Sequence, residues 1–251
     1  MKAELRGLPK DLALIVGAHL VAAGELIDED PELAYRHAEA ARRRAARLPI
    51  VREATAETAY AAGQFAVALN EYRALRRMSG GPDYTAVMAD CERALGRPED
   101  ALRLIAEATA TPGALDDPQL WTEVTLVEAG ARADLGQQAE AVRVLTGAIS
   151  ARRGSPLSQA RLRYAYAELL LARGDEPGAR EWFRSAGALD AEDELGVDER
   201  LSELDGVILD LLPDEEPEDE VDDEIDADAE DDASAPHDQG PDEEREQEDE
   251  Q

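Results

Sequence analysis

The sequence is poor in the residues that mark most kinds of functional site. Its 251 residues include one Cys, three His, two Trp, two Phe and six Tyr. The single cysteine, Cys91, excludes an internal disulfide framework and is typical of a reducing compartment, so we expect a cytoplasmic protein. Only Lys2 and Lys10 are lysines. We attribute the bias toward Arg to a GC-rich genome rather than to phosphate binding.

Long apolar runs are also absent. No stretch approaches the ~20 apolar residues that a membrane-spanning helix needs. The apolar segment Leu12–Ala23 resembles an export signal, but Glu4 and Asp11 precede it and His19 interrupts it. Because its large residues follow helical spacing, we expect the first helix of the fold here and no contact with a membrane.

Positive charge is scarce. The chain has 58 Asp and Glu residues against 26 Lys and Arg, a net charge of −32, which disfavours nucleic-acid binding. From Pro213 to Gln251 there are 22 acidic residues, one base (Arg245) and only Val221 and Ile225 as large aliphatics. Such a segment cannot bury enough apolar surface to fold. We therefore predict a folded domain over 1–212 and a disordered acidic tail over 213–251.

Nothing in the sequence indicates catalysis. There is no phosphate-binding or dinucleotide-binding glycine motif, and His19 and His37 have no ligand spacing around them. Cys91 lies between Asp90 and Glu92, whose carboxylates raise the pKa of a thiol and make it a poor nucleophile. The arginines 42–44 and 47 point around a helix rather than forming one patch. We predict no catalytic residue, no metal and no cofactor, and hence a protein that is not an enzyme.

One pattern recurs four times. An Ala is followed seven residues later by a Gly and five residues after that by a second Ala. Small residues at these offsets let two helices cross closely with a Gly turn between them, as in a solenoid of helical hairpins. The sets are Ala56–Gly63–Ala68, Ala89–Gly96–Ala101, Ala129–Gly136–Ala141 and Ala167–Gly174–Ala179.

Capping residues place the helices around these turns. Asp30–Pro31, Asp117–Pro118 and Ser155–Pro156 each supply an N-cap followed by a proline at the first helical position. An atypical first hairpin precedes the four regular ones, and a final helix covers the open end of the stack. We expect helices over 10–27, 31–48, 50–62, 65–78, 84–95, 98–109, 118–135, 138–152, 156–173, 177–189 and 198–212.

The pattern resembles that of tetratricopeptide repeat proteins. That family repeats a helix–turn–helix unit with an A-x3-F step in the second helix. The step is present here as Ala68–Tyr72, Ala101–Ile105, Ala141–Leu145 and Ala179–Phe183. The Trp and Tyr of the family's first helix are mostly missing, so another bi-helical solenoid is the alternative. The resemblance implies an all-α right-handed superhelix; beyond the repeat, the chain is similar to actinobacterial-type repeat proteins with an acidic tail.

The resemblance also implies a function, the binding of a protein or peptide segment by the first helices of the hairpins. Family members that clamp a terminal carboxylate use Lys and Asn there, whereas this chain has acidic or apolar residues and a single base, Arg93. We therefore expect a basic or basic–apolar partner, with Tyr60 and Tyr164 as apolar anchors. The alternative is a regulatory decoy or chaperone-like factor whose acidic tail engages a basic protein. The predicted partner-binding residues are Glu53, Glu57, Tyr60, Val87, Asp90, Arg93, Leu126, Val127, Tyr164 and Glu168.

Overall fold

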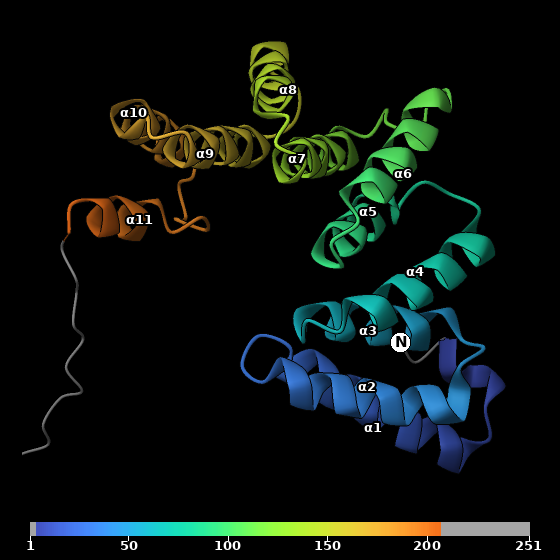
Figure 1. The fold of residues 1–251 in the computed structure, drawn as a ribbon. Coiled ribbons are helices and arrows are strands. Elements are labelled where there is room, and N and C mark those ends of the chain that lie inside the picture. The colour runs from blue at the N-terminus through green and yellow to red at the C-terminus, as the bar shows by residue number, and fades with distance from the viewer. Residues whose placement is uncertain (1–3, 207–251) are drawn as a thin grey trace, which may run out of the picture. The chain divides into compact units, whose positions relative to one another are not determined.

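The structure is a computed structural model that describes residues 4–206. Within that range the chain forms one short 3-10 helix and eleven α-helices, and no strand (Figure 1). The predicted domain boundary at Leu212 and the acidic segment 213–251 lie outside the described residues. The elements are η1 (Glu4–Gly7), α1 (Lys10–Leu26), α2 (Pro31–Ala45), α3 (Pro49–Ala61), α4 (Phe65–Ser79), α5 (Thr85–Ala94), α6 (Pro98–Ala110), α7 (Pro118–Asp134), α8 (Gln138–Ala151), α9 (Pro156–Ala172), α10 (Glu176–Gly187) and α11 (Val197–Leu204).

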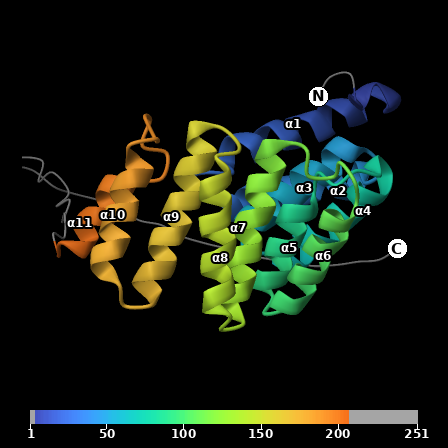
Figure 2. The same cartoon turned by 90° about the horizontal axis from the view of Figure 1, so that it is seen from above.

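The helices pack as five consecutive hairpins. α1 pairs with α2, α3 with α4, α5 with α6, α7 with α8 and α9 with α10, and each even helix also packs against the next odd helix. Figure 1 shows the hairpins following one another in chain order, and in Figure 2 the order from α7 to α11 can be followed side by side. α1 also contacts α3, and α7 contacts both α5 and α9. The first helices of successive hairpins therefore form one common face, and the predicted all-α helical-hairpin solenoid is confirmed.

The repeated glycines end the first helix of each regular hairpin. Gly63 has a φ of 69°, in the left-handed region that costs glycine nothing. The amide of the next residue, Gln64, donates to the carbonyl of Ala59 over 2.7 Å, which closes the helix end. Gly96, Gly136 and Gly174 take the same conformation, and the residue after each makes the same bond. The repeated glycine is thus explained by the positive φ that the turn requires.

The small residues of the repeat lie at the helix crossings. Ala68, Ala101, Ala141 and Ala179 are all fully buried, and the large residue four positions later is buried in each case. Four of the core clusters span one hairpin and the first helix of the next, and the last joins α9 and α10 to α11. For example, Ala101 and Ile105 of α6 pack with Val124 and Val127 of α7. This arrangement confirms the repeat register.

Overpacking one of these crossings is expected to destabilise the fold. Changing Ala101 or Ala179 to Leu forces a larger side chain between helices that leave no space for it. We therefore expect the free energy of unfolding to fall by about 1–3 kcal/mol. Ala66 is an exposed alanine of α4, and Ala66→Leu serves as the control. Urea denaturation followed by circular dichroism measures both. Equal midpoints for the buried-site and control variants would contradict the register.

The two ends of the stack are closed differently. At the N-terminal end Leu5 of η1 is buried against α1. At the C-terminal end Val197 of α11 is buried in the cluster of the last hairpin. The sequence predicted one helix over 198–212, whereas α11 ends at Leu204. Gly206 has a φ of 71°, which terminates the helix; the remainder of the prediction lies outside the described residues.

Two histidines meet inside the first hairpin. The Nδ1 atoms of His19 in α1 and His37 in α2 lie 3.1 Å apart, so one ring donates its proton to the other. This bond needs one Nδ1 to be deprotonated. Burial, His37 and Arg44 lower the pKa of His19 below its ordinary value. From the sequence, both histidines were predicted to be ordinary helix residues, because their spacing gives no sign that they contact each other.

The histidine pair predicts a stability loss in acid. Since His19 binds a proton less readily in the folded protein than in the unfolded chain, protonation favours unfolding. The free energy of unfolding should therefore fall as the pH drops below about 6.5. His19→Gln removes the titrating group and should flatten that part of the profile. Urea midpoints between pH 7.5 and 5.5 compare the two proteins; parallel profiles would show that His19 does not contribute.

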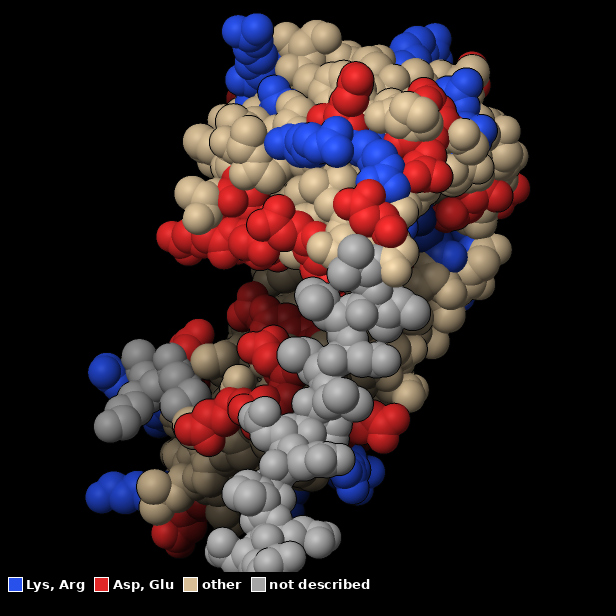
Figure 3. Space-filling view, turned by 90° about the vertical axis from the view of Figure 1, so that its left-hand side faces the viewer, with Lys and Arg blue, Asp and Glu red and all other residues tan. Residues whose placement is uncertain are grey.

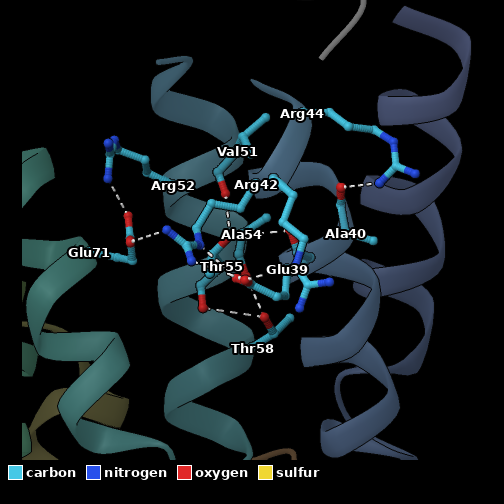
Figure 4. Close-up of polar contacts among 12 residues, drawn as sticks. Glu39, Ala40, Arg42, Arg44, Val51, Arg52, Ala54, Thr55, Thr58 and Glu71 are labelled. Atoms are coloured by element: carbon cyan, nitrogen blue, oxygen red, sulfur yellow. Dashed lines mark hydrogen bonds and ion pairs between the residues drawn. The ribbon is translucent and has the colours of Figure 1, made fainter. Parts of the chain in front are cut away.

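Buried ion pairs join neighbouring hairpins. Glu71 of α4 is only 6% exposed and lies between Arg42 of α2 and Arg52 of α3 (Figure 4). Its carboxylate accepts from Arg52 over 2.5 Å and from Arg42 over 3.5 Å. Glu92 of α5, 2% exposed, pairs with Arg73 of α4 over 2.6 Å. These contacts fix how one hairpin sits on the next.

Candidate partner-binding groove

The first helices of the middle hairpins line an open groove of about 440 Å³. It lies between α3, α5, α7 and α9, on the face that the odd-numbered helices share. On the side of the molecule drawn in Figure 3, acidic side chains gather along a hollow. The groove residues are Tyr60, Asp83, Ala86, Val87, Asp90, Arg93, Leu120, Glu123, Leu126, Val127 and Arg161.

The structure brings most of the sequence-predicted residues together. Six of the ten line this groove, and these are Tyr60, Val87, Asp90, Arg93, Leu126 and Val127. Four others, Glu53, Glu57, Tyr164 and Glu168, do not line it. The sequence reasoning missed Leu120 and Glu123, although they precede Val127 by seven and four residues on the same helix. That spacing puts them on one face and was the available signal.

The groove has an apolar floor. Val87 of α5 and Leu126 of α7 are partly buried, and Ala86 and Val127 beside them are each 9% exposed. Leu120 extends the apolar surface about two turns toward the start of α7. Such a floor offers an apolar side chain a place to leave water.

The arginines at the groove are each paired with a carboxylate. Arg93 donates to Asp90 over 2.9 Å and to Asp134 of α7 over 2.8 Å. Its guanidinium crosses α7 at Gly130, where an added Cβ would lie 2.5 Å from Cζ of Arg93. Arg161 of α9 makes a two-pronged pair with Glu123 of α7. Neither cation is left unpaired for an acidic ligand.

Several of the predicted binding residues also bond to a neighbouring hairpin or to α11. The Tyr60 hydroxyl donates to Asp90 over 2.5 Å, and burial together with this bond raises the pKa of Tyr60. Glu53 of α3 accepts from the hydroxyl of Tyr84 over 3.3 Å. Glu168 of α9 holds Arg200 of α11 through bonds of 2.7 and 3.0 Å. These polar groups maintain the spacing of the hairpins.

Tyr164 has a packing role. Its ring meets the buried ring of Phe183 edge to face, with the centroids 5.0 Å apart. It belongs to the periphery of the C-terminal core cluster rather than to the groove. Of the two tyrosines predicted as anchors, only Tyr60 borders the groove.

Two carboxylates on this face have no ionic partner. Glu57 and Asp83 are exposed, and within residues 4–206 neither makes a hydrogen bond or an ion pair. Partial burial and the neighbouring Glu53 raise the pKa of Glu57, so its ionised form lacks the stabilisation that a cation would supply. Asp83 borders the groove at the start of α5. The uncompensated charge of this face is therefore negative.

The described residues show little that could support chemistry. Among them no group of three or more His, Cys, Asp or Glu lies close enough to hold a metal ion. Burial, with Asp90 and Glu92 nearby, raises the pKa of Cys91 to about 12, so its thiolate is negligible at neutral pH. None of the described helices has the length and apolar character needed to cross a membrane.

Comparison with known proteins supports the fold. The structure is similar to the crystal structure of a thermophilic tetratricopeptide repeat protein of Thermus thermophilus, with a TM-score of 0.56 and 20% identity. The match covers 75% of this chain and 97% of that one. No protein-family profile and no curated protein matches the sequence. At this identity the likeness concerns the fold, and it confirms the tetratricopeptide-like solenoid.

Proposed function

We propose that this protein is a protein-interaction scaffold, not an enzyme, that binds a basic–apolar segment of a partner in the groove between α3 and α9. The observation that carries the proposal is an apolar floor at Val87 and Leu126 with two uncompensated carboxylates near it. Asp83 lines the groove, and Glu57 lies outside it, about one turn before the groove residue Tyr60 on α3. Apolar side chains of the segment fill the floor, while its Lys or Arg residues approach the carboxylates. The partner is a protein or peptide, and neither nucleic acid nor a membrane is involved.

The charges on this face mainly set the selectivity and the association rate. Exposed ion pairs each contribute about 0.2–1 kcal/mol, so the apolar floor supplies most of the affinity. Salt should weaken binding, because the Debye length falls from about 10 Å at 0.1 M to about 3 Å at 1 M. Because the arginines of the groove are paired, an acidic segment would meet only carboxylates that repel it.

The alternative is a decoy whose acidic tail does the binding. Residues 213–251 carry 22 of the 58 acidic side chains, enough to attract a basic protein without any groove. Deleting 213–251 separates the two. The groove hypothesis expects the truncated chain to keep its partner, and the decoy hypothesis expects it to lose it. Under either hypothesis we propose that the protein acts in the cytoplasm.

Reversing the two unpaired carboxylates should weaken binding by roughly tenfold, the equivalent of about 1.4 kcal/mol. The test compares Glu57→Lys/Asp83→Lys with the wild type on an array of peptides that differ in charge and apolar content. Basic–apolar peptides should bind the wild type best, and added salt should lower their affinity. Helicity by circular dichroism should not change, because neither side chain bonds to another described residue.

A control variant carries the same charge change elsewhere. Glu181 of α10 is exposed and lies away from the groove, so Glu181→Lys tests for a general effect of net charge. Val87→Glu places a charge on the apolar floor and should abolish the binding of the peptides' apolar side chains. Equal affinities for the double variant, the control and the wild type would contradict a role for this face.

A further inference from the structure

The first helix presents an apolar stripe to solvent. Among the residues that the structure describes, four large hydrophobic side chains are exposed, and three of them, Leu14, Ile15 and Val21, belong to α1. Their exposed fractions are 72%, 47% and 41%. No charged residue occurs between Asp11 and Glu25. The stripe is therefore concentrated on one helix and is uninterrupted by charge.

Its position at the end of the stack makes the stripe unusual. Val16, Leu20 and Ala23 on the other side of α1 are buried in the first hairpin. The terminal unit of a solenoid needs a polar outer face for solubility, and apolar patches that stay exposed generally mark interaction sites. Within residues 4–206, Leu14 and Val21 keep 72% and 41% of their surface exposed.

The arrangement of residues along α1 fits a second copy of the same helix. Leu14 and Val21 lie at equal distances from the point between Gly17 and Ala18, and so do Lys10 and Glu25. A two-fold axis at that point, with the helices antiparallel, sets each Leu14 against Val21 of the other copy. It also sets each Lys10 against Glu25 of the other copy. Asp11 then falls opposite Gly24, and the small Ala18 allows close approach near the axis.

We infer that α1 is the interface of a symmetric homodimer in which two copies pair through antiparallel α1 helices. The contact runs over about 22 Å, the length of helix between residues 10 and 25. One helix from each copy makes a small interface, so the dimer is weak and depends on concentration. A closed two-fold contact also uses the same patch on both copies and leaves none exposed.

The net charge gives the dimer a distinctive salt dependence. Two chains of charge −32 repel each other, and salt screens that repulsion. The apolar part of the contact, between Asp11 and Glu25, is uncharged and is not weakened by salt. Salt also screens the two Lys10–Glu25 pairs, but exposed pairs contribute only about 0.2–1 kcal/mol each, so the repulsion between the two chains dominates. Salt should therefore strengthen dimerisation, whereas it should weaken the groove binding proposed above. The inference does not depend on that proposed function.

Sedimentation of the full chain over a wide concentration range tests the interface. The wild type should shift from monomer toward dimer as concentration and salt rise. Leu14→Glu buries a charge at the contact and should raise the dissociation constant at least about tenfold. Met78 of α4, 49% exposed, provides the matched control, because Met78→Glu adds the same charge at an isolated apolar side chain. A wild type that stays monomeric at every concentration and salt overturns the inference.

A charge swap tests the antiparallel register. Lys10→Glu and Glu25→Lys should each weaken the dimer, since each opposes like charges across the interface twice. Together they recreate both pairs with the signs exchanged, and the double variant should recover the wild-type dissociation constant. Parallel helices would place Lys10 against Lys10, and the swap would then give no recovery. Additive losses in the double variant thus overturn the register.

A cysteine at the axis gives an independent readout. Ala18→Cys should form a disulfide-linked dimer under mild oxidation, because the two Ala18 positions lie close together at the axis. Cys91 is buried and protonated, so it does not compete. Ala66→Cys on α4 is the exposed control and should remain unlinked. Equal crosslinking of the two variants would overturn the pairing of two α1 helices.

Discussion

Replacing Arg42 and Arg52 by Met is expected to lower the free energy of unfolding by about 3–5 kcal/mol. Both guanidinium groups contact the buried carboxylate of Glu71, at 3.5 and 2.5 Å. Their removal leaves an ionised group in a site that is 6% exposed, without the cations that compensated its loss of water. Glu39, the other partner of Arg42, keeps its ion pair with Arg43. Urea denaturation followed by circular dichroism measures the loss.

A triple variant separates the buried charge from lost packing. Adding Glu71→Met to the two arginine changes removes the uncompensated carboxylate, and most of the lost stability should return. The methionines fill much of the volume of the side chains that they replace. If the triple variant were as unstable as the double variant, the loss would come from packing at the junction of α2, α3 and α4, and the ion-pair account would be wrong.

The helices and turns could be predicted because their signals are local. A glycine that must adopt a positive φ, such as Gly63, determines its own turn whatever surrounds it. Asp30, Asp117 and Ser155 cap the helices that follow them, as predicted, because the cap bonds span only two or three residues. The end of α11 was predicted too late, since the apolar spacing of its sequence continues past the glycine at 206 that stops the helix.

The groove was only partly predictable because its contacts run between hairpins. The repeat register places Tyr60, Val87 and Leu126 on the shared face, and they do meet at one groove. The register does not say which side chains bond from one hairpin to the next, far along the sequence. Asp90 bonds to Tyr60, and Arg93 bonds to Asp134, so residues predicted to contact a partner also join neighbouring hairpins. In a chain with 58 acidic residues, no single carboxylate stands out as a member of such a pair.

Phe183→Ala is the second change expected to have a large effect, a loss of about 3–5 kcal/mol. Phe183 is the largest of the fully buried side chains in the described residues. It packs against Tyr164 of α9 and belongs to the cluster that includes Ala167, Leu170 and Val197. Truncation leaves a cavity where α9, α10 and α11 meet, and these rigid helices cannot fully close it.

The position of Phe183 in a stack of hairpins also determines how the loss is observed. Each hairpin contacts only its neighbours, so the C-terminal hairpin and α11 should unfold at lower urea than the rest of the solenoid. Trp182 lies beside the cavity in α10, and in a Trp121→Phe background its fluorescence reports on this hairpin alone. The fluorescence transition should precede the loss of helicity measured by circular dichroism. Phe65→Ala removes the other Phe, which is only partly buried, and should cost less. Equal losses in the two variants, with coincident transitions, would show that Phe183 does not hold the C-terminal end together.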